Sequence, residues 1–330
     1  MMDLLAIGDL MIDFTPAGIS PKGNPVYEQN PGGAPANVCV TLSRLGGKAL
    51  FLGSVGNEMF GRFLQKKLEE YNVDGRGLHF SSEGVTKLSF VTLDANHDRS
   101  FFFMPSPLAE IHLRPEDIDT TLLDECKVFL LSTVSQYQEP IRSTSAWLIE
   151  QAHNRGRLVA YDPNWNKAFS FDPSFEREVI RSTIAKADIV KISLEEANFV
   201  YGDTSFEALA SMAMEEGVKL FTMTSGAKGC QYCYAGGSGK VPGFRIEAID
   251  TTGAGDAFMG GLIYSLTRPD IGRIDSISPQ KMHAILSFAN ACGAVCATKR
   301  GGMPSVDGIE EVWNCMEQFK PEKKQDKWED

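Results

Sequence analysis

Strand-like and helix-like segments alternate along almost the whole of this 330-residue chain. The strand-like segments are short apolar runs, whereas the helix-like segments carry apolar residues three and four positions apart. The expected strands are residues 4–8, 49–56, 128–132, 157–162, 187–192 and 219–225, and the expected helices are residues 36–45, 58–71, 140–154, 174–186, 205–216, 255–266 and 280–299. Strands that alternate with helices join into a parallel sheet covered by helices on both faces. The sequence therefore predicts a doubly wound α/β fold.

Two stretches, at about 10–31 and 85–104, interrupt this alternation. In the second stretch, TKLSFVTLD and DRSFFFMP flank a polar turn at 95–98, which is the pattern of an antiparallel hairpin. We expect the two stretches to form a small sheet over one edge of the parallel sheet. The balanced charges of residues 320–330 predict a solvated polar tail.

The composition excludes several classes of protein. Lys and Arg number 32 against 43 Asp and Glu, and a formal net charge of −11 argues against a nucleic-acid or anionic-membrane partner. The start of the chain lacks a basic region and no apolar run is long enough to span a membrane, so we expect neither a signal peptide nor a membrane helix. Seven thinly scattered cysteines favour a reducing cytoplasm over a disulfide framework.

Two cysteine pairs have spacings that metal or redox sites can use. Cys230 and Cys233 are three apart on a strand-like segment and so point to opposite faces, which disfavours a shared metal. Cys292 and Cys296 share a helix face, where we expect them to be core residues. The five histidines form no HExxH pattern, so the sequence does not support a zinc hydrolase.

The segment DTTGAGD at 250–256 is the most informative motif. Gly253 and Gly255 flank Ala254 at the expected start of a helix, where free backbone N–H groups and the helix dipole make an anion site. Asp256 fits this anion site if the anion is a transferring phosphoryl group and the carboxylate receives the proton of the attacking hydroxyl. A glycine-rich turn with a first-turn aspartate explains the same spacing, and the spacing alone does not separate the two interpretations.

A second glycine site, PGGAPAN at 31–37, precedes the first long helix. Gly32 and Gly33 permit close approach of the backbone to a ligand, and the Asn37 amide offers both a donor and an acceptor. Other glycine-rich templates fail, because the chain has neither GxxxxGK[ST] nor a GxGxxG after its first strand. A P-loop NTPase and a Rossmann dehydrogenase are therefore poor fits.

Together these motifs resemble the two signatures of the PfkB/ribokinase-like carbohydrate kinases. The signature segments are GGAPANVCVTLSRLGG and DTTGAGDAFMGGL, and the resemblance covers nearly the whole chain. The opening segment, from IGDLMIDF to GGAPANV, is most similar to fructokinases. The resemblance implies one ribokinase-like α/β domain over residues 1–330, with segments of about 10–31 and 85–104 forming a lid. It also implies a homodimer formed through the lid.

The resemblance further implies a role for each matching residue. Asp256 matches the catalytic base, and Gly253, Ala254 and Gly255 match the backbone anion hole. Residues matching sugar contacts are Asp13, Gly32, Gly33, Asn37 and the lid residue Phe103. Residues matching the site for ATP are Lys191, Glu196, Thr224, Gly226, Gly229 and Asn290. Glu196 matches the acid that organises Mg²⁺, while Asp250, Thr252 and Ser305 match a loop pair that often binds a monovalent cation, typically potassium.

Three positions depart from the family pattern. Ser193 replaces the usual Asn, and Pro105 and Asn166 stand where fructokinases and 2-keto-3-deoxygluconate kinases often carry Arg. Because a carboxylate substrate favours a bidentate Arg, the two missing arginines favour a neutral sugar. The resemblance thus implies an ATP-dependent kinase that converts fructose to fructose 6-phosphate. Alternatives are a same-fold kinase for 2-keto-3-deoxygluconate, ribose or a nucleoside, and a non-catalytic nucleotide- or sugar-binding protein, which would have no need of Asp256.

Overall fold

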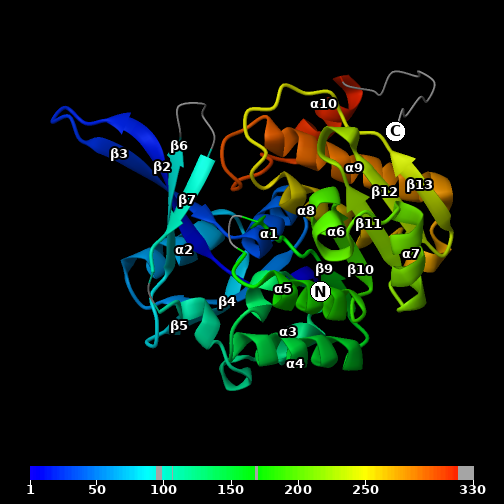
Figure 1. Ribbon diagram of the computed structural model, residues 1–330, viewed down its shortest axis with the longest axis horizontal. Helices are drawn as coiled ribbons and strands as arrows, with labels where there is room; N and C mark the ends of the chain where they lie inside the picture. Colours follow the sequence, from blue (N-terminus) through cyan, green and yellow to red (C-terminus); the bar gives the residue numbers. More distant parts are fainter. Residues whose placement is uncertain (94–98, 106, 168–169, 319–330) are drawn as a thin grey trace.

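A nine-stranded sheet forms the centre of the computed structural model, which describes residues 1–93, 99–105, 107–167 and 170–318 (Figure 1). The order of its strands is β13-β12-β11-β10-β9-β8-β1-β4-β5. The strands are β1 (Met2–Ile7), β4 (Ala49–Gly56), β5 (Asp74–Ser81), β8 (Cys126–Leu131), β9 (Leu158–Tyr161), β10 (Ile189–Ser193), β11 (Leu220–Thr224), β12 (Cys230–Tyr234) and β13 (Gly237–Val241). All pairs from β5 to β11 are parallel, and β12 and β13 continue the sheet as an antiparallel hairpin.

Alternate strand residues enter two separate cores, one on each face of the sheet. On β1, Leu4 and Ala6 lie in the core beneath α1 (Ala34–Arg44), α2 (Met59–Glu70), α8 (Ala254–Leu266) and α9 (Pro279–Ala297). Leu5 and Ile7 lie in the core beneath α3 (Thr121–Asp124), α4 (Ile141–Asn154), α5 (Pro173–Ile184), α6 (Leu194–Tyr201) and α7 (Phe206–Glu215). A last helix, α10 (Ile309–Gln318), contributes Val312 and Cys315 to a third core with α9. The predicted doubly wound α/β fold is confirmed.

A separate four-stranded sheet, in the order β3-β2-β6-β7, stands at one end of the molecule, away from β11, β12 and β13 (Figure 1). Its strands are β2 (Met11–Ile19), β3 (Pro25–Gly32), β6 (Lys87–Leu93) and β7 (Arg99–Phe103). The predicted hairpin is confirmed, because β6 and β7 pair antiparallel, and β6 also pairs in parallel with β2. The turn at 95–98 and the tail at 320–330 lie outside the described residues.

The cysteines and the helices agree with two further expectations. All seven cysteines are free, and Cys230 and Cys233 contact the cores on opposite faces of the large sheet. Cys292 and Cys296 are buried in the third core. Among the described helices, none has the length and apolar character needed to cross a membrane.

Candidate active site

Asp256 lies in the first turn of α8 and is 5% exposed. The turn before it depends on glycine, because Gly253 has a φ of 78° and a Cβ there would lie 2.7 Å from the Cα atom of Gly302. No acidic residue other than Asp256 occupies this first turn. The start of α8 therefore presents backbone N–H groups, the positive end of the helix dipole and one buried carboxyl group.

Two asparagine side chains hold the Asp256 carboxyl group. The Asn37 Nδ2 atom donates to Oδ2 at 2.8 Å, across a sequence separation of 219 residues. The Asn164 Nδ2 atom donates to Oδ1 at 3.0 Å. Asn37 is itself fixed in the first turn of α1, where its backbone N–H donates to the Gly33 carbonyl at 2.9 Å. The two glycine-rich motifs of the sequence therefore meet at one carboxyl group.

The environment of Asp256 raises its pKa to about 6. Burial is the largest cause, because a desolvated carboxylate is costly, and repulsion from Asp9 and Glu196 acts in the same direction. The hydrogen bond from Asn37 and the attraction of Lys191 lower the pKa and so limit the rise. The carboxyl group is thereby suited to accept a proton near neutral pH.

A buried ion pair lies beside Asp256. The Lys191 Nζ atom lies 3.0 Å from Asp162 Oδ1, and both side chains are 5% exposed. Burial acts to lower the pKa of Lys191, but attraction by Asp162 and Glu196 outweighs it and the pKa is raised. Burial raises the pKa of Asp162 to about 7. A Cβ at Gly255 would come within 2.9 Å of Lys191 Nζ, so the ammonium group lies against the glycine-rich turn.

Glu196 organises the start of α6. The Ser193 Oγ atom accepts from the Glu196 backbone N–H at 3.1 Å, while the Glu196 carboxylate accepts from the Ser193 backbone N–H at 2.6 Å, which makes a capping box. The other carboxylate oxygen accepts from the Trp165 backbone N–H at 2.8 Å. Ser193, the departure from the family pattern, is therefore a good N-cap residue.

The residues expected at the sugar lie where the small sheet meets the large one. A Cβ at Gly32 would lie 2.6 Å from Asp13 Oδ2, and Gly33 has a φ of 113°. The Asp13 carboxylate accepts a hydrogen bond from Ser89 Oγ. Phe103 pairs with Ser89 across β6 and β7. The structure thus brings the predicted sugar residues of the small sheet together around Ser89.

Of the six residues expected at the nucleotide, Lys191 and Glu196 lie beside Asp162, whereas the other four lie around the turn between β11 and β12 and the end of β13. Thr224 is the last residue of β11. A single 3₁₀ turn follows, which begins at Gly226 with a φ of 54° and is followed by Gly229 with a φ of 90°. A Cβ at Gly229 would lie 2.1 Å from the carbonyl oxygen of Val241. The Asn290 amide on α9 donates to that same carbonyl at 3.2 Å. The predicted loop and Asn290 therefore flank one backbone segment.

The loop pair expected at a monovalent cation is also assembled. Asp250 Oδ1 accepts from the Thr252 backbone N–H at 3.0 Å, and Oδ2 accepts from the Gly301 backbone N–H at 2.8 Å. Ser305 is fully buried and its hydroxyl donates to the Gly302 carbonyl at 2.5 Å. Within the described part of the chain, no group of three or more His, Cys, Asp or Glu side chains is arranged to hold a metal ion.

Several residues of the site were missed at the level of sequence. They are Asn164, which holds Asp256, Asp162, which pairs with Lys191, and Ser89, which donates to Asp13. For Asp162 and Asn164 a signal existed, since DPNWN at 162–166 directly follows a strand of the parallel sheet, at the edge where ligands bind in such folds. Ser89 carried no comparable signal.

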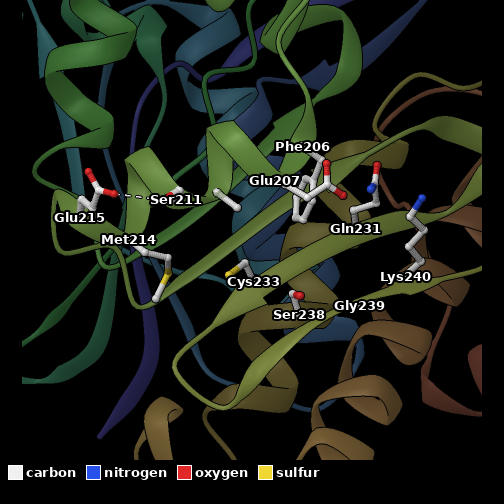
Figure 2. A pocket seen from close by; sticks show the side chains of 11 residues that line it. Phe206, Glu207, Ser211, Met214, Glu215, Gln231, Cys233, Ser238, Gly239 and Lys240 are labelled. Atoms are coloured by element: carbon white, nitrogen blue, oxygen red, sulfur yellow. Dashed lines mark hydrogen bonds between the residues drawn. The ribbon is translucent and has the colours of Figure 1, made fainter.

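A cavity of about 620 Å³ lies elsewhere, between α7 and the hairpin of β12 and β13 (Figure 2). Phe206 and Met214 line it from α7, while Cys233 and Lys240 line it from the hairpin. None of the predicted site residues lines this cavity. The site around Asp256 is therefore distinct from it.

Comparison with known proteins places the chain in a family. Residues 1–308 match the model of the pfkB family carbohydrate kinases. The chain is 36% identical over 306 residues to a probable fructokinase-2 of Arabidopsis thaliana, covering 92% of each chain. It is 38% identical over 317 residues to fructokinase-1 of Oryza sativa subsp. japonica, covering 95% of this chain and 97% of the relative.

Solved structures of similar proteins agree with this placement. A fructokinase from Xylella fastidiosa with bound ATP superposes with a TM-score of 0.87 at 27% identity, covering 96% of this chain and 99% of that one. A fructokinase from Vibrio cholerae O395 with bound fructose, ADP and calcium ion superposes with a TM-score of 0.81 at 33% identity, covering 95% and 98%. The fold, the extent of the family match and the identities agree, and this chain belongs to the pfkB family of carbohydrate kinases.

Proposed function

We propose that this chain is an ATP-dependent fructokinase, which transfers the γ-phosphoryl group of ATP to fructose and yields fructose 6-phosphate and ADP. The observation that carries the proposal is the buried Asp256 carboxyl group, held by Asn37 and Asn164 at the start of α8. The choice of fructose rests on relatives named fructokinases, which the chain matches over nine-tenths of its length. The two missing arginines at Pro105 and Asn166 also favour a neutral sugar.

In this mechanism Asp256 accepts the proton of the attacking sugar hydroxyl. The backbone N–H groups of Gly253 and Gly255, with the α8 dipole, stabilise the charge on the transferring phosphoryl oxygens. The N–H of Ala254, which the sequence also assigned to the anion hole, donates instead to the Thr251 carbonyl at 3.1 Å. Lys191, which lies against Gly255, adds a positive charge on the same side. Phosphoryl transfer needs mainly such positioning and electrostatic stabilisation, because the protein forms no covalent bond to the group.

The residues present fit a magnesium ion that arrives with the nucleotide. Asp162 Oδ2 is buried and has no hydrogen-bond partner within the described residues, and the Glu196 carboxylate lies within electrostatic reach of Asp162. We assign these two carboxylates to the magnesium ion and its waters, an arrangement that needs few direct protein ligands. When bound, Mg²⁺ neutralises charge on the β- and γ-phosphates.

We also assign potassium to the loop pair of Asp250, Thr252 and Ser305. Asp250 ties the loop before α8 to Gly301, so a cation at this point would order the turn that carries Gly253. Gly229 and Asn290 are assigned to the nucleotide because both contact the segment at Val241, and Thr224 and Gly226 are assigned with them because they begin the turn that ends at Gly229. Asp13, Gly32, Gly33, Asn37 and Phe103 are assigned to the sugar.

The small sheet is proposed as the lid over the sugar and as the dimer interface. It exposes apolar side chains, with Ile19 69% and Phe102 59% exposed and Val26 and Tyr27 also exposed. Such side chains on strands with open edges favour burial against a second copy. A closed lid would exclude water, which competes with the sugar as phosphoryl acceptor.

The cytoplasm stays our prediction for the cell compartment of this protein.

The test is an ADP-release assay over a panel of acceptors, with and without potassium. We expect turnover with fructose, and we expect Asp256→Asn to lower kcat by roughly 10²- to 10⁴-fold while leaving the thermal melting curve intact. Asp270→Asn is the matched control, because Asp270 pairs with Lys281 on the surface and its side chain is 72% exposed. Near-normal turnover in Asp256→Asn would overturn the proposal. Turnover with 2-keto-3-deoxygluconate, ribose or a nucleoside instead of fructose would keep the kinase and change the substrate.

A further inference from the structure

Lys87, at the start of β6, is a largely buried lysine that the mechanism above does not use. Its Nζ atom lies 3.1 Å from Asp9 Oδ2 and 3.2 Å from Glu110 Oε1. The three side chains are 14%, 7% and 11% exposed, in the order Lys87, Asp9 and Glu110. We call these three residues the acid–lysine cluster. Burying two carboxylates around one ammonium group is costly, so the cluster calls for an explanation.

Each carboxylate in the cluster keeps one oxygen without a partner. Asp9 Oδ1 and Glu110 Oε2 are buried and accept no hydrogen bond from the described residues. A buried oxygen of an ionised carboxylate is costly unless a donor reaches it. Asp9 and Glu110 also line a cavity of about 10 Å³, so the donors that these two oxygens need come from a bound water or from a ligand. Two of the three Lys87 N–H donors go to the cluster's own carboxylates.

The cluster borders the residues assigned to the sugar. Lys87 Nζ lies 5.6 Å from the centroid of the Phe103 ring. Ser89 lies two residues further along β6 and therefore on the same face of the strand as Lys87. Its hydroxyl donates a hydrogen bond to Asp13. On the other side, a Cβ at Gly33 would lie 2.3 Å from the Asp9 carbonyl oxygen. Asp9 is also near enough to Asp256 to repel its negative charge.

The register of β6 and β7 shows which residue lies opposite Lys87. Ser89 pairs with Phe103, and the Met104 backbone N–H donates to the Leu88 carbonyl at 3.0 Å. Continuing this antiparallel register places Lys87 opposite Pro105, so a cation introduced at position 105 would face the place of Lys87 from the neighbouring segment.

We propose that Lys87, held between Asp9 and Glu110, contacts the acceptor, and that the acid–lysine cluster selects a neutral polyhydroxylated sugar against a sugar acid. This inference rests on the proposed sugar-kinase function. Sugar hydroxyls donate to Asp9 Oδ1 and Glu110 Oε2 and accept from the Lys87 ammonium group. The carboxylate of a sugar acid has no proton to donate at neutral pH. It would also meet two carboxylates against one cation.

The first experiment compares Lys87→Ala with the double variant Lys87→Ala/Pro105→Arg. We expect Lys87→Ala to raise the KM for fructose by about 30-fold or more, since it leaves two buried carboxylates without their cation. The KM for ATP should change less than about twofold. The double variant returns a cation from the opposite strand, so its kcat/KM for fructose should be at least about tenfold higher than that of Lys87→Ala. Lys66→Ala is the matched control, because Lys66 lies on α2 with its side chain 75% exposed.

The second experiment tests selectivity with Glu110→Gln, which removes one negative charge and keeps the side-chain shape. We expect the ratio of kcat/KM for fructose to kcat/KM for 2-keto-3-deoxygluconate to fall by about tenfold. This variant, with the conservative Lys87→Arg, keeps the inference testable if Lys87→Ala does not fold. Lys87→Arg should retain fructose binding.

The outcomes separate this inference from the proposed function. A folded Lys87→Ala protein with an unchanged KM for fructose overturns the role of Lys87, as does an unchanged selectivity ratio in Glu110→Gln. If the unmodified protein prefers a sugar acid, the inference is overturned, but the proposal that the protein is a kinase stands. If the protein phosphorylates no acceptor, the proposed function fails. Calorimetric titration with fructose then decides the inference, because loss of fructose binding in Lys87→Ala supports it and equal binding overturns it.

Discussion

The Asp256 carboxyl group works within a narrow pH range that its neighbours set. Its pKa is raised to about 6, chiefly by burial. The group must be ionised to accept a proton, so activity should be present above this pKa and should fall as the pH decreases through it. We expect kcat/KM for fructose, measured from about pH 5 to about pH 8, to show an acidic limb near pH 6.

The Asn37→Ala variant tests whether this acidic limb reports the pKa of Asp256. Asn37 donates to Asp256 and lowers its pKa, so Asn37→Ala should move the acidic limb to higher pH, whatever it does to the maximal rate. A limb that moves to lower pH, or one that does not move at all, would contradict the assignment of the limb to Asp256.

At the residue scale, the sequence predicts which residues belong to the site better than it predicts their hydrogen-bond partners. Asp256 and Asn37 were both identified from local glycine-rich motifs, but their mutual hydrogen bond joins elements 219 residues apart. Asn164 has a φ of 48°, an uncommon conformation for a residue other than glycine, which places its amide beside Asp256. No local pattern encodes such a contact, because it depends on how strand ends line up in the folded sheet.

At the element scale, the cap of α6 links helix stability to the nucleotide site. Ser193→Ala removes the hydroxyl that accepts from the Glu196 N–H, and we expect a loss of about 1 kcal/mol in the free energy of unfolding. Because Glu196 is assigned to the magnesium ion, the KM for MgATP should also rise. Urea unfolding and steady-state kinetics measure the two effects.

The matched control for this cap is Ser205→Ala at the start of α7. The Ser205 hydroxyl accepts from the Ala208 N–H, so its loss should cost a similar free energy of unfolding. The KM for MgATP should stay unchanged, since α7 carries none of the assigned residues. Equal kinetic effects of the two variants would argue against a role for Glu196 at the nucleotide.

Most elements with strong periodicity were predicted, but the amphipathic helix α10 was not, and elements with weak periodicity were missed. The six strands expected in the parallel sheet are confirmed, because each is a short apolar run buried on both faces. The strand β5, with the sequence DGRGLHFS, was not predicted, since it is an edge strand with two glycines and several polar residues. The helix α6 was also missed, because it is only eight residues long.

At the scale of the whole molecule, the small sheet predicts a dimer. Ile19, on β2, is 69% exposed, and a charge at this position should weaken a dimer formed through the small sheet. We expect sedimentation velocity to show a dimer for the unmodified protein and a shift toward monomer for Ile19→Glu. Met212→Glu on α7 is the control, because Met212 is also exposed and lies on a helix that packs against the large sheet. A monomer at all concentrations in the unmodified protein would reject the dimer.

The parallel pairing of β2 with β6 has a consequence for the order in which the chain folds. Asp13 pairs with Ser89, so the pairing must close a long loop that contains β4, α2 and β5. Loop-closure entropy disfavours such distant contacts until the intervening segment is already compact. The small sheet should therefore assemble after β1, β4 and β5 have paired, because those pairs close shorter loops. In amide hydrogen exchange on the native protein, it should open at a lower free energy than those strands do.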